Sequence, residues 1–383
     1  MSIRQYNLGS IVKPGFNPLA AQTTTYNYYL YSWGQNSSGQ LGLGDVTDRS
    51  SPVQVGALTN WSAVTIGSNF SAGLKTDGTI WTWGSNSAGG LGLGNITYYS
   101  SPKQVGSLTN WSQISAGAGF CLALKTDGTL WSWGANGQGQ LGLNSATYAF
   151  SSPSQVGSLT AWSQVAAGNG YSLALKTDGT AWSWGSSFST GKLGLGNQTD
   201  YSSPKQIGAL TNWSKIYASR NSSFGIKTDG TLWSWGLNSQ GILGNGNTTT
   251  YSSPIQIGAL TNWLFVAGGY ADCSAVKTNN TIWSWGRNSN GQLGLGDTTD
   301  RSSPVQIGAL TNWLSVACGR YTRASVKTDG TLWVWGRNVI GQLGLGNTTS
   351  YSSPKQVGSL TTWGAVPYSS GSQSIQQMMA LLY

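Results

Sequence analysis

The chain has 383 residues, of which 38% are hydrophobic and only 8% are charged, and its formal net charge is +9. All eleven acidic residues are aspartate, and the sequence contains neither glutamate nor histidine. Those two residue types supply much of the general acid–base catalysis near neutral pH, and histidine is a common ligand of zinc and iron. We therefore expect a protein that is not an enzyme and that has no metal site and no other cofactor.

Residues 1–25 resemble no other part of the chain, and we expect them to form an extended N-terminal arm. The arm lacks the charged start and continuous apolar core of a signal peptide, and no stretch approaches the ~18 apolar residues of a transmembrane helix. Neither secretion nor membrane insertion is predicted. A proline-containing arm without a core of its own is either disordered or docked on a neighbouring chain as an anchor. The anchor residues would be Arg4, Tyr6, Ile11, Val12, Phe16 and Leu19.

Residues 26–383 are predicted to form one domain, because a unit of about fifty residues recurs along them. The motif Trp-X-Trp-Gly, or Tyr-Ser-Trp-Gly in its first copy, appears seven times, and a lone tryptophan follows each copy. These two markers contain all twenty tryptophans, so we assign every tryptophan an architectural role. The second indole of each motif is expected to fill the space between neighbouring sheets, at Trp83, Trp133, Trp184, Trp235, Trp285 and Trp335.

Each repeat predicts four short antiparallel strands, as residues 111–155 illustrate. The first strand begins at Trp111, the second ends before a Thr-Asp-Gly turn, the third carries Trp-Ser-Trp-Gly, and the outer strand contains Ser-Ser-Pro. Seven such units predict an all-β, seven-bladed β-propeller of four-stranded antiparallel blades. The chain starts in a third strand (residues 26–34) and ends in an apolar run (residues 375–383). We therefore expect a closing blade shared between two N-terminal and two C-terminal strands.

The repeated pattern Lys-Thr-Asp-Gly-Thr-Leu-Trp-Ser-Trp-Gly, then Gly-Gln-Leu-Gly-Leu-Gly, then Ser-Ser-Pro-X-Gln-Val-Gly resembles the regulator of chromosome condensation (RCC1-like) repeat family. The resemblance covers residues 26–383 and implies a seven-bladed propeller with a shared closing blade. The family's best-known member is a chromatin-bound guanine-nucleotide exchange factor for the small GTPase Ran. That activity, as the resemblance implies it, uses a protruding β-wedge with acidic and histidine contacts. These repeats have no insertion of that size and no histidine, so the resemblance supplies a fold and not an activity.

Differences between such similar repeats indicate where a function could lie. The loop between the first and second strands and the loop after Trp-X-Trp-Gly should share one face, with the Lys-Thr-Asp-Gly turns on the other. The first of these faces carries most of the variation, and we expect a basic and aromatic sector there. Its residues would be Arg220, Tyr270, Arg287, Arg320, Tyr321, Arg323 and Arg337. Arginine and tyrosine are enriched in protein-interface hot spots and can also bind anionic groups. The alternative is neutral variation among surface loops.

The charge of +9 does not by itself indicate nucleic-acid binding, because the basic residues are dispersed. Six of them are the lysines of the repeated turns, which we expect to lie on a solvated surface: Lys75, Lys125, Lys176, Lys227, Lys277 and Lys327. A site for a phosphate backbone would cluster them on one face. Three cysteines without paired spacing (Cys121, Cys273 and Cys318) predict buried thiols rather than disulfides or a metal site.

Three functional hypotheses follow. The first is a structural or binding protein of a virion, most plausibly a bacteriophage component, with the arm docked on another subunit and the propeller displayed toward a host-surface ligand. Its location would be the virion, and otherwise the cytoplasm. The second is an intracellular regulator resembling the chromatin- or GTPase-binding members of the family. The third is a lectin-like propeller that binds carbohydrate.

Overall fold

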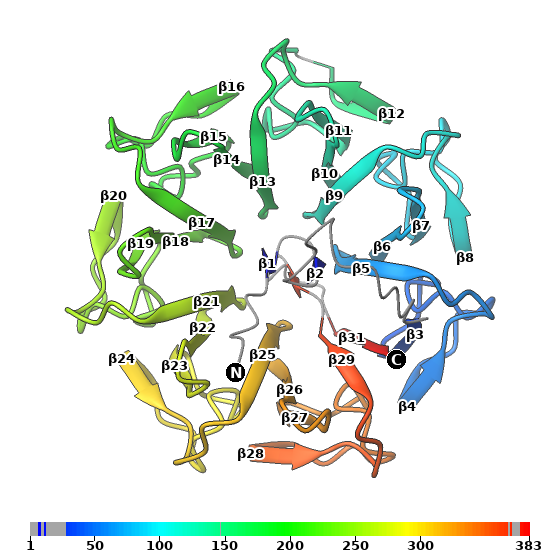
Figure 1. Cartoon of the computed structure of the whole chain (residues 1–383), viewed down its shortest axis with the longest axis vertical. Coiled ribbons are helices and arrows are strands. Elements are labelled where there is room, and N and C mark those ends of the chain that lie inside the picture. Colours follow the sequence, from blue (N-terminus) through cyan, green and yellow to red (C-terminus); the bar gives the residue numbers. More distant parts are fainter. Residues whose placement is uncertain (1–6, 9–10, 13–27, 146, 367, 370–375) are drawn as a thin grey trace, which may run out of the picture.

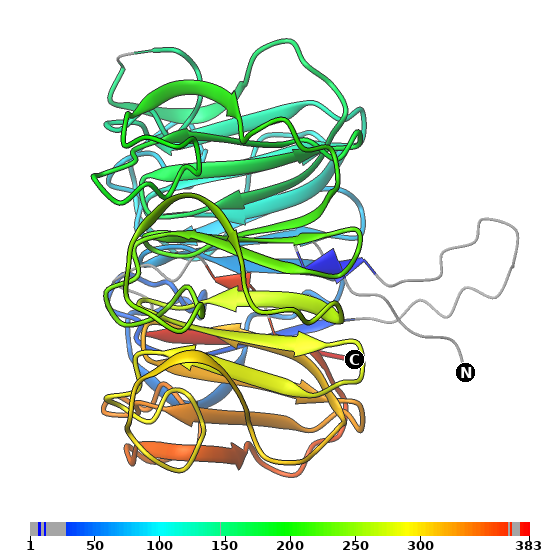
Figure 2. The ribbon, with the colours of Figure 1, turned by 90° about the vertical axis from the view of Figure 1, so that its left-hand side faces the viewer.

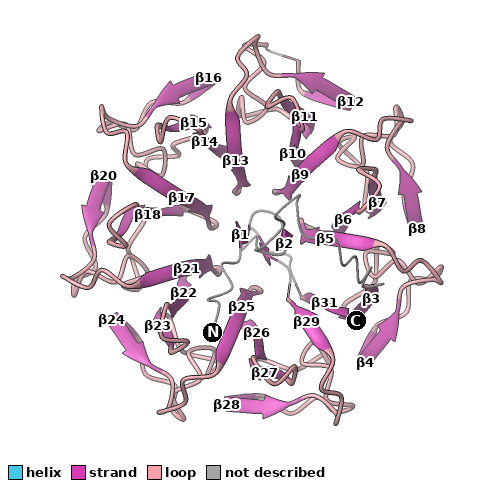
Figure 3. Cartoon of the chain, in the orientation of Figure 1, coloured by secondary structure: helices cyan, strands magenta, loops and turns pink. Residues whose placement is uncertain are grey.

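The computed structural model describes residues 7–8, 11–12, 28–145, 147–366, 368–369 and 376–383. Within these ranges every regular element is a β-strand, and all the strands except β1 and β2 belong to seven sheets around a common axis (Figures 1 and 3). The predicted fold class, a seven-bladed propeller of antiparallel blades, is confirmed. Seen from the side, the blades make a thick disc whose loops gather at its two faces (Figure 2). No helix in these ranges is long and apolar enough to cross a membrane.

The two inner strands of each blade provide most of the core. The innermost strands are β5 (Trp61–Ile66), β9 (Trp111–Ala116), β13 (Trp162–Ala167), β17 (Trp213–Ala218), β21 (Trp263–Gly268), β25 (Trp313–Cys318) and β29 (Trp363–Ala365). The second strands are β6 (Phe70–Lys75), β10 (Phe120–Lys125), β14 (Tyr171–Lys176), β18 (Ser222–Lys227), β22 (Asp272–Lys277), β26 (Thr322–Lys327) and β31 (Gln377–Leu382).

The third strands carry the Trp-X-Trp motif, and the fourth strands form the rim. The third strands are β3 (Tyr29–Gly34), β7 (Ile80–Gly84), β11 (Leu130–Ala135), β15 (Ala181–Gly185), β19 (Leu232–Gly236), β23 (Ile282–Gly286) and β27 (Leu332–Gly336). The fourth strands are β4 (Arg49–Gln54), β8 (Tyr99–Gln104), β12 (Ala149–Gln155), β16 (Tyr201–Gln206), β20 (Tyr251–Gln256), β24 (Arg301–Gln306) and β28 (Tyr351–Gln356). Blades 1 to 6 begin at β5, β9, β13, β17, β21 and β25 and each take four consecutive strands.

Blade 7 closes the ring with strands from both ends of the chain. Its strand order is β29-β31-β3-β4, and β31 pairs with β3 over six residues, with Met378 opposite Trp33. The shared closing blade predicted from the sequence is therefore confirmed. A two-residue strand, β30 (Tyr368–Ser369), adds in parallel to β5 of blade 1. The third strand starts at Tyr29, three residues later than expected, and Ile375 lies outside the described residues.

The described part of the arm is a short hairpin over the axis of the ring. Strands β1 (Asn7–Leu8) and β2 (Ile11–Val12) pair with each other, and β2 lies next to β5 of the same chain (Figure 1). Ile11 and Val12 thus belong to β2, whereas Arg4, Tyr6, Phe16 and Leu19 lie outside the described residues. The docking of the arm on a neighbouring chain stays a prediction.

The second indole of each motif locks neighbouring blades together. Trp33, Trp83, Trp133, Trp184, Trp235, Trp285 and Trp335 have no exposed surface. Each indole donates a hydrogen bond to a backbone carbonyl of the preceding blade's loop, as Trp133 does to Gly90 at 3.0 Å. The approach needs glycine beside it, because a Cβ on Gly92 (φ +71°) would lie 2.7 Å from the Trp133 nitrogen.

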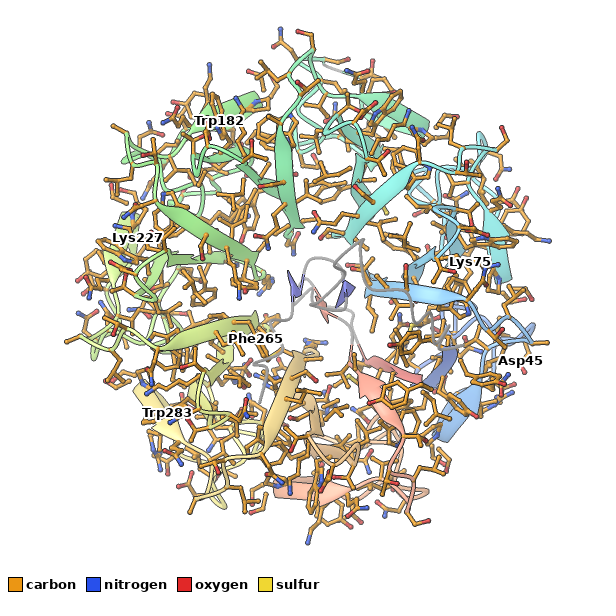
Figure 4. The ribbon with its side chains drawn as sticks, viewed as in Figure 1. Asp45, Lys75, Trp182, Lys227, Phe265 and Trp283 are labelled. Atoms are coloured by element: carbon orange, nitrogen blue, oxygen red, sulfur yellow. The ribbon has the colours of Figure 1, made fainter. Side chains whose placement is uncertain are left out.

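The lysines of the repeated turns are not spread over a solvated surface, and that expectation was wrong. The amino group of Lys227 lies 3.5 Å from the ring centre of Trp233, and the other five turn lysines lie 3.7–4.3 Å from the equivalent ring. Four of the six lysine side chains are buried. A lysine at the end of the second strand faces the first indole of Trp-X-Trp, and cation–π attraction holds it there. Figure 4 shows Lys75 and Lys227 farther from the ring axis than Phe265, which lies near it.

An innermost strand has one edge that pairs with no other strand of its blade. Side chains of the preceding blade form hydrogen bonds with some of the backbone amides and carbonyls at that edge. Gln164 in blade 3 accepts a hydrogen bond from the amide of Ile216 in blade 4 and donates one to its carbonyl, at 3.0 and 2.8 Å. Gln113 accepts from the amide of Val165 at 2.7 Å. In blade 4 the same position is Lys215, which donates to the carbonyl of Leu264 at 2.5 Å. Backbone groups at a buried sheet edge are costly if unpaired, so these side chains tie the ring together.

Candidate functional site

The two faces of the ring carry different loops. The loop between the first and second strands meets the loop after the third strand, because Arg287 donates its amide to the carbonyl of Ala271 at 3.0 Å. The same contact joins Arg337 to Tyr321 at 2.9 Å. We call the side of the ring with these loops the loop face. The Lys-Thr-Asp-Gly turns lie at the opposite ends of the strands, on what we call the turn face.

Six of the seven residues of the predicted sector meet on the loop face of blades 4 to 6. The rings of Tyr270 and Tyr321 lie 5.6 Å apart between their centres, inclined by 52°. The guanidinium of Arg320 lies over both rings, at 5.3 and 5.0 Å. Arg220 lies 4.2 Å from the centre of Tyr270, and Arg287 lies 5.3 Å from that of Tyr321. We call these five side chains together with Arg337 the Arg/Tyr cluster.

The Arg/Tyr cluster is held in place but remains accessible. Arg337 completes it at 5.9 Å from the Tyr321 ring, and all six side chains are half-buried. Among the described residues, none of Arg287, Arg320 and Arg337 forms an ion pair with a carboxylate. A guanidinium that lies against an aromatic ring keeps its edge N–H groups available for a carboxylate or a phosphate. The cluster therefore presents four positive charges in a fixed arrangement.

Arg323 does not belong to the exposed sector, and its assignment there was wrong. Its side chain is fully buried between blades 5 and 6, where it forms an ion pair with the equally buried Asp272. It also donates to the carbonyl of Thr322 at 2.7 Å and to the hydroxyl of Ser274 at 3.2 Å. Arg323 lies in β26 opposite Trp335, so its side chain points into the space between blades. The sequence argument had treated it as a loop residue.

The buried pair adds no net charge beneath the cluster. Desolvation raises the pKa of Asp272, and the positive charges of Arg323 and Arg287 oppose that shift. The charge of Arg287 thus reaches Asp272 from the cluster above. Since Arg323 and Asp272 balance each other, the pair does not offset the positive charges of the arginines above it.

The corresponding part of blades 1 and 2 is hollow. A cleft of about 310 Å³ lies there, lined by small or polar residues that include Ser68, Ser85 and Ala118. The positions of Ser68 and Ser85 are those of Arg320 and Arg337 in blade 6. Blades 5 and 6 therefore carry large side chains where blades 1 and 2 leave open space.

Two features near the cluster were missed from the sequence. Lys192 in blade 3 is buried where blades 2 and 5 have Gln140 and Gln292, and desolvation lowers its pKa to about 8. Phe188, in the same loop, is 69% exposed. The signal for both was an interval of 51 residues between Trp182 and Trp233, one more than between most copies.

The part of the chain that the structure describes holds no cluster of side chains suited to a metal. Among the described residues, no group of three or more cysteine and aspartate side chains is close enough to hold an ion. The three cysteines are buried and form no disulfide, and desolvation raises the pKa of Cys318 to about 11. Such thiols stay protonated at neutral pH and are poor nucleophiles.

The comparison with protein families decides the classification. The RCC1-like domain model matches residues 29–375. The chain belongs to the RCC1-like domain family. A comparison with curated protein sequences gave no match.

Two solved structures share the propeller fold over most of their length. Prp20p of Saccharomyces cerevisiae, described with its binding to Gsp1p and histones, is 19% identical with a TM-score of 0.80. The match covers 94% of this chain and 92% of Prp20p. Human WBSCR16 is 22% identical with a TM-score of 0.81, over 93% of this chain and 98% of the human one. At these identities the likeness establishes the fold alone.

Proposed function

We propose that this chain is a non-enzymatic protein-binding propeller whose Arg/Tyr cluster recognises an acidic segment of a partner protein. The observation that carries the proposal is the arrangement of Arg287, Arg320 and Arg337 around Tyr321, without a carboxylate partner among the described residues. Arginine and tyrosine with limited freedom lose little entropy on binding, so they suit an interface.

The distribution of charge favours a protein partner over nucleic acid. The cluster spans three of seven blades, and the six turn lysines are engaged with indole rings on the turn face. A duplex would need a basic surface that follows its backbone over many phosphates. An acidic peptide needs only a few carboxylates at the spacing of the arginines.

The solved relatives favour the regulator hypothesis among the three hypotheses from sequence. Yeast Prp20p is described as binding Gsp1p and histones, and yeast RCC1 (Prp20) has also been solved bound to Kap60. Those partners are proteins, which supports a protein partner for this chain. The virion and carbohydrate hypotheses receive no support from the comparisons.

Fluorescence anisotropy with three labelled probes tests the proposal. The probes are a twelve-residue peptide rich in Asp and Glu, a neutral peptide of the same length, and a short DNA duplex. We expect the acidic peptide to bind most tightly and the Arg320→Glu/Arg337→Glu variant to weaken it at least tenfold. The control is Lys103→Glu/Lys355→Glu, which changes two exposed rim lysines and the net charge equally. Equal weakening in both variants, or tightest binding to the duplex, would overturn the proposal.

A further inference from the structure

One loop on the loop face departs from the design that the other six blades share. In those six blades an asparagine after the third strand accepts a hydrogen bond from a leucine amide, at 2.8–3.1 Å, and so braces the loop. The bracing residues are Asn36, Asn86, Asn136, Asn238, Asn288 and Asn338. Blade 3 has Ser187 at this position and one additional residue before Leu193.

The additional residue places a large aromatic side chain in solvent. Phe188 and Ser189 have φ angles of +41° and +52°, in the left-handed region that side chains other than glycine and asparagine rarely adopt. The phenylalanine ring is 69% exposed, so its own burial does not offset the backbone strain. Strained and exposed residues that the fold does not need are found preferentially at functional sites.

This loop borders the Arg/Tyr cluster. The amino group of Lys192 at its end donates to the carbonyl of Asn169 at 2.9 Å and lies 5.0 Å from the ring centre of Tyr171. The carbonyl of Lys192 accepts a hydrogen bond at 2.7 Å from the hydroxyl of Ser223, which lies three residues after Arg220 at the blade 4 end of the cluster. The loop of residues 186–192 therefore adjoins the cluster across the boundary between blades 3 and 4.

The loops of blades 7, 1 and 2 differ from those of blades 4, 5 and 6 in the polarity of their exposed side chains. Their loops expose four apolar side chains, at 51–72% of their surface: Val46, Ile96, Tyr98 and Tyr148. Blades 4, 5 and 6 have Thr248, Thr298 and Thr348 at the position of Ile96. The exposed apolar side chains of the loop face thus lie mainly in blades 7, 1, 2 and 3, where Phe188 lies next to blade 4, and Val339 of blade 6, two residues after Arg337, is 51% exposed as well.

We infer that Phe188 is the apolar contact of the same recognition surface, so that the partner segment carries a large hydrophobic side chain beside its acidic residues. The inference rests on the proposed function. Charge complementarity determines which partner segment binds, because the arginines attract carboxylates. The exposed ring beside them is stabilised only by contact with another apolar group. A purely acidic segment would leave that ring in water.

Selection from a displayed library of random twelve-residue peptides tests the inference. Three proteins are used as bait: the unmodified chain, Phe188→Ser and Arg320→Glu/Arg337→Glu. We expect the unmodified chain to enrich peptides with Asp or Glu next to Phe, Leu, Ile or Trp. Phe188→Ser should keep the acidic enrichment and lose at least threefold of the apolar enrichment. The arginine variant should lose the acidic enrichment.

The outcomes separate the two claims. If Phe188→Ser selects the same acidic and apolar peptides as the unmodified chain, the inference fails and the proposed function stands. If the unmodified chain enriches acidic peptides without an apolar residue, the inference also fails. If it enriches no acidic peptides, the proposed function fails with it.

One selected peptide then gives a quantitative check. Its affinity should fall at least tenfold when its apolar residue is replaced by alanine, and that replacement should have little effect on the Phe188→Ser protein. Leu310→Ser, which removes a side chain that is 50% exposed on the turn side, is the matched control and should leave affinity unchanged. Equal losses with Phe188→Ser and Leu310→Ser would overturn the inference.

Discussion

The carboxylate of Asp272 in blade 5 pairs with the guanidinium of Arg323 in blade 6, and neither side chain has any exposed surface. Blade 4 has Ser222 and Ser223 at the two equivalent positions. A small residue at the position of Arg323 hydrogen-bonds to the preceding blade, as Ser223 does to the carbonyl of Lys192 at 2.7 Å. The ion pair replaces that contact and ties blades 5 and 6 together beneath the Arg/Tyr cluster.

Removing one member of this pair should be far more harmful than removing both. Asp272→Ser leaves a buried guanidinium without its counter-charge, and we expect a loss of about 3–5 kcal/mol in the free energy of unfolding. The double variant Asp272→Ser/Arg323→Ser leaves no unpaired buried charge, so it should be more stable than Asp272→Ser even though the smaller serines leave a cavity. Chemical denaturation measures both. A double variant as unstable as the single one would show that the cost arises from packing and not from the unpaired charge.

Lys215 should stabilise the ring less at neutral pH than a glutamine at the same position, because its buried amino group is charged there. Desolvation lowers its pKa to about 8, so between pH 8 and the ordinary lysine value the unfolded chain binds more protons than the folded one. Stability from this group therefore rises with pH across that window. Lys215→Gln copies Gln164 and should stabilise the chain by about 1–3 kcal/mol at pH 7. Thermal unfolding from pH 7 to 10.5 should show this advantage shrinking, and a constant advantage would contradict the assignment.

The C-terminal strand should be required for ring closure. Deleting residues 369–383 removes β31, which lies between β29 and β3 in blade 7. Trp33 and Trp363, both buried in that blade, would be exposed to water. We expect a red shift of tryptophan fluorescence and rapid proteolysis. Deletion of residues 1–25 is the control, because it leaves all four strands of blade 7 in place, and an equal effect of both deletions would contradict the closing role of β31.

Phe188 should lower the stability of the free protein. Phe188→Asn places a residue that tolerates the left-handed region at φ +41°, so we expect a gain of roughly 0.5–1 kcal/mol. Tyr148→Asn is the matched control, since Tyr148 is 72% exposed but is not among the residues with positive φ. Calorimetry compares the stability of the two variants. If Tyr148→Asn stabilises the protein as much as Phe188→Asn does, backbone strain at Phe188 is not the cause of the gain.

Most of the fold was predictable because the same sequence pattern recurs seven times along the chain. The spacing of Trp-X-Trp-Gly predicted the blades, and the third strand at residues 26–34 with the apolar run at residues 375–383 predicted the closing blade. Side-chain direction at the ends of strands was harder to predict. Lys75 and Arg323 were taken as surface residues, although each belongs to a strand and points toward a neighbouring indole or blade. The sequence contained one sign of this ion pair, because an aspartate, Asp272, and an arginine, Arg323, occur in adjacent repeats.

The cluster itself was found because its residues deviate from the repeat at loop positions, where side chains face solvent. Its internal geometry could not be predicted, since the distance between Tyr270 and Tyr321 depends on how two blades pack. Phe188 was overlooked because a single additional residue changes the backbone conformation without changing the motif around it.

Hydrogen exchange on the protein bound to a selected acidic peptide tests the account most directly. We predict that binding slows exchange in the loops of residues 219–222, 269–272 and 319–322 and in the loop of residues 186–192, while the turns on the opposite face are unaffected. Protection confined to the turns at residues 75–79 and their equivalents, with none in these loops, would contradict the assignment of the Arg/Tyr cluster as the recognition surface.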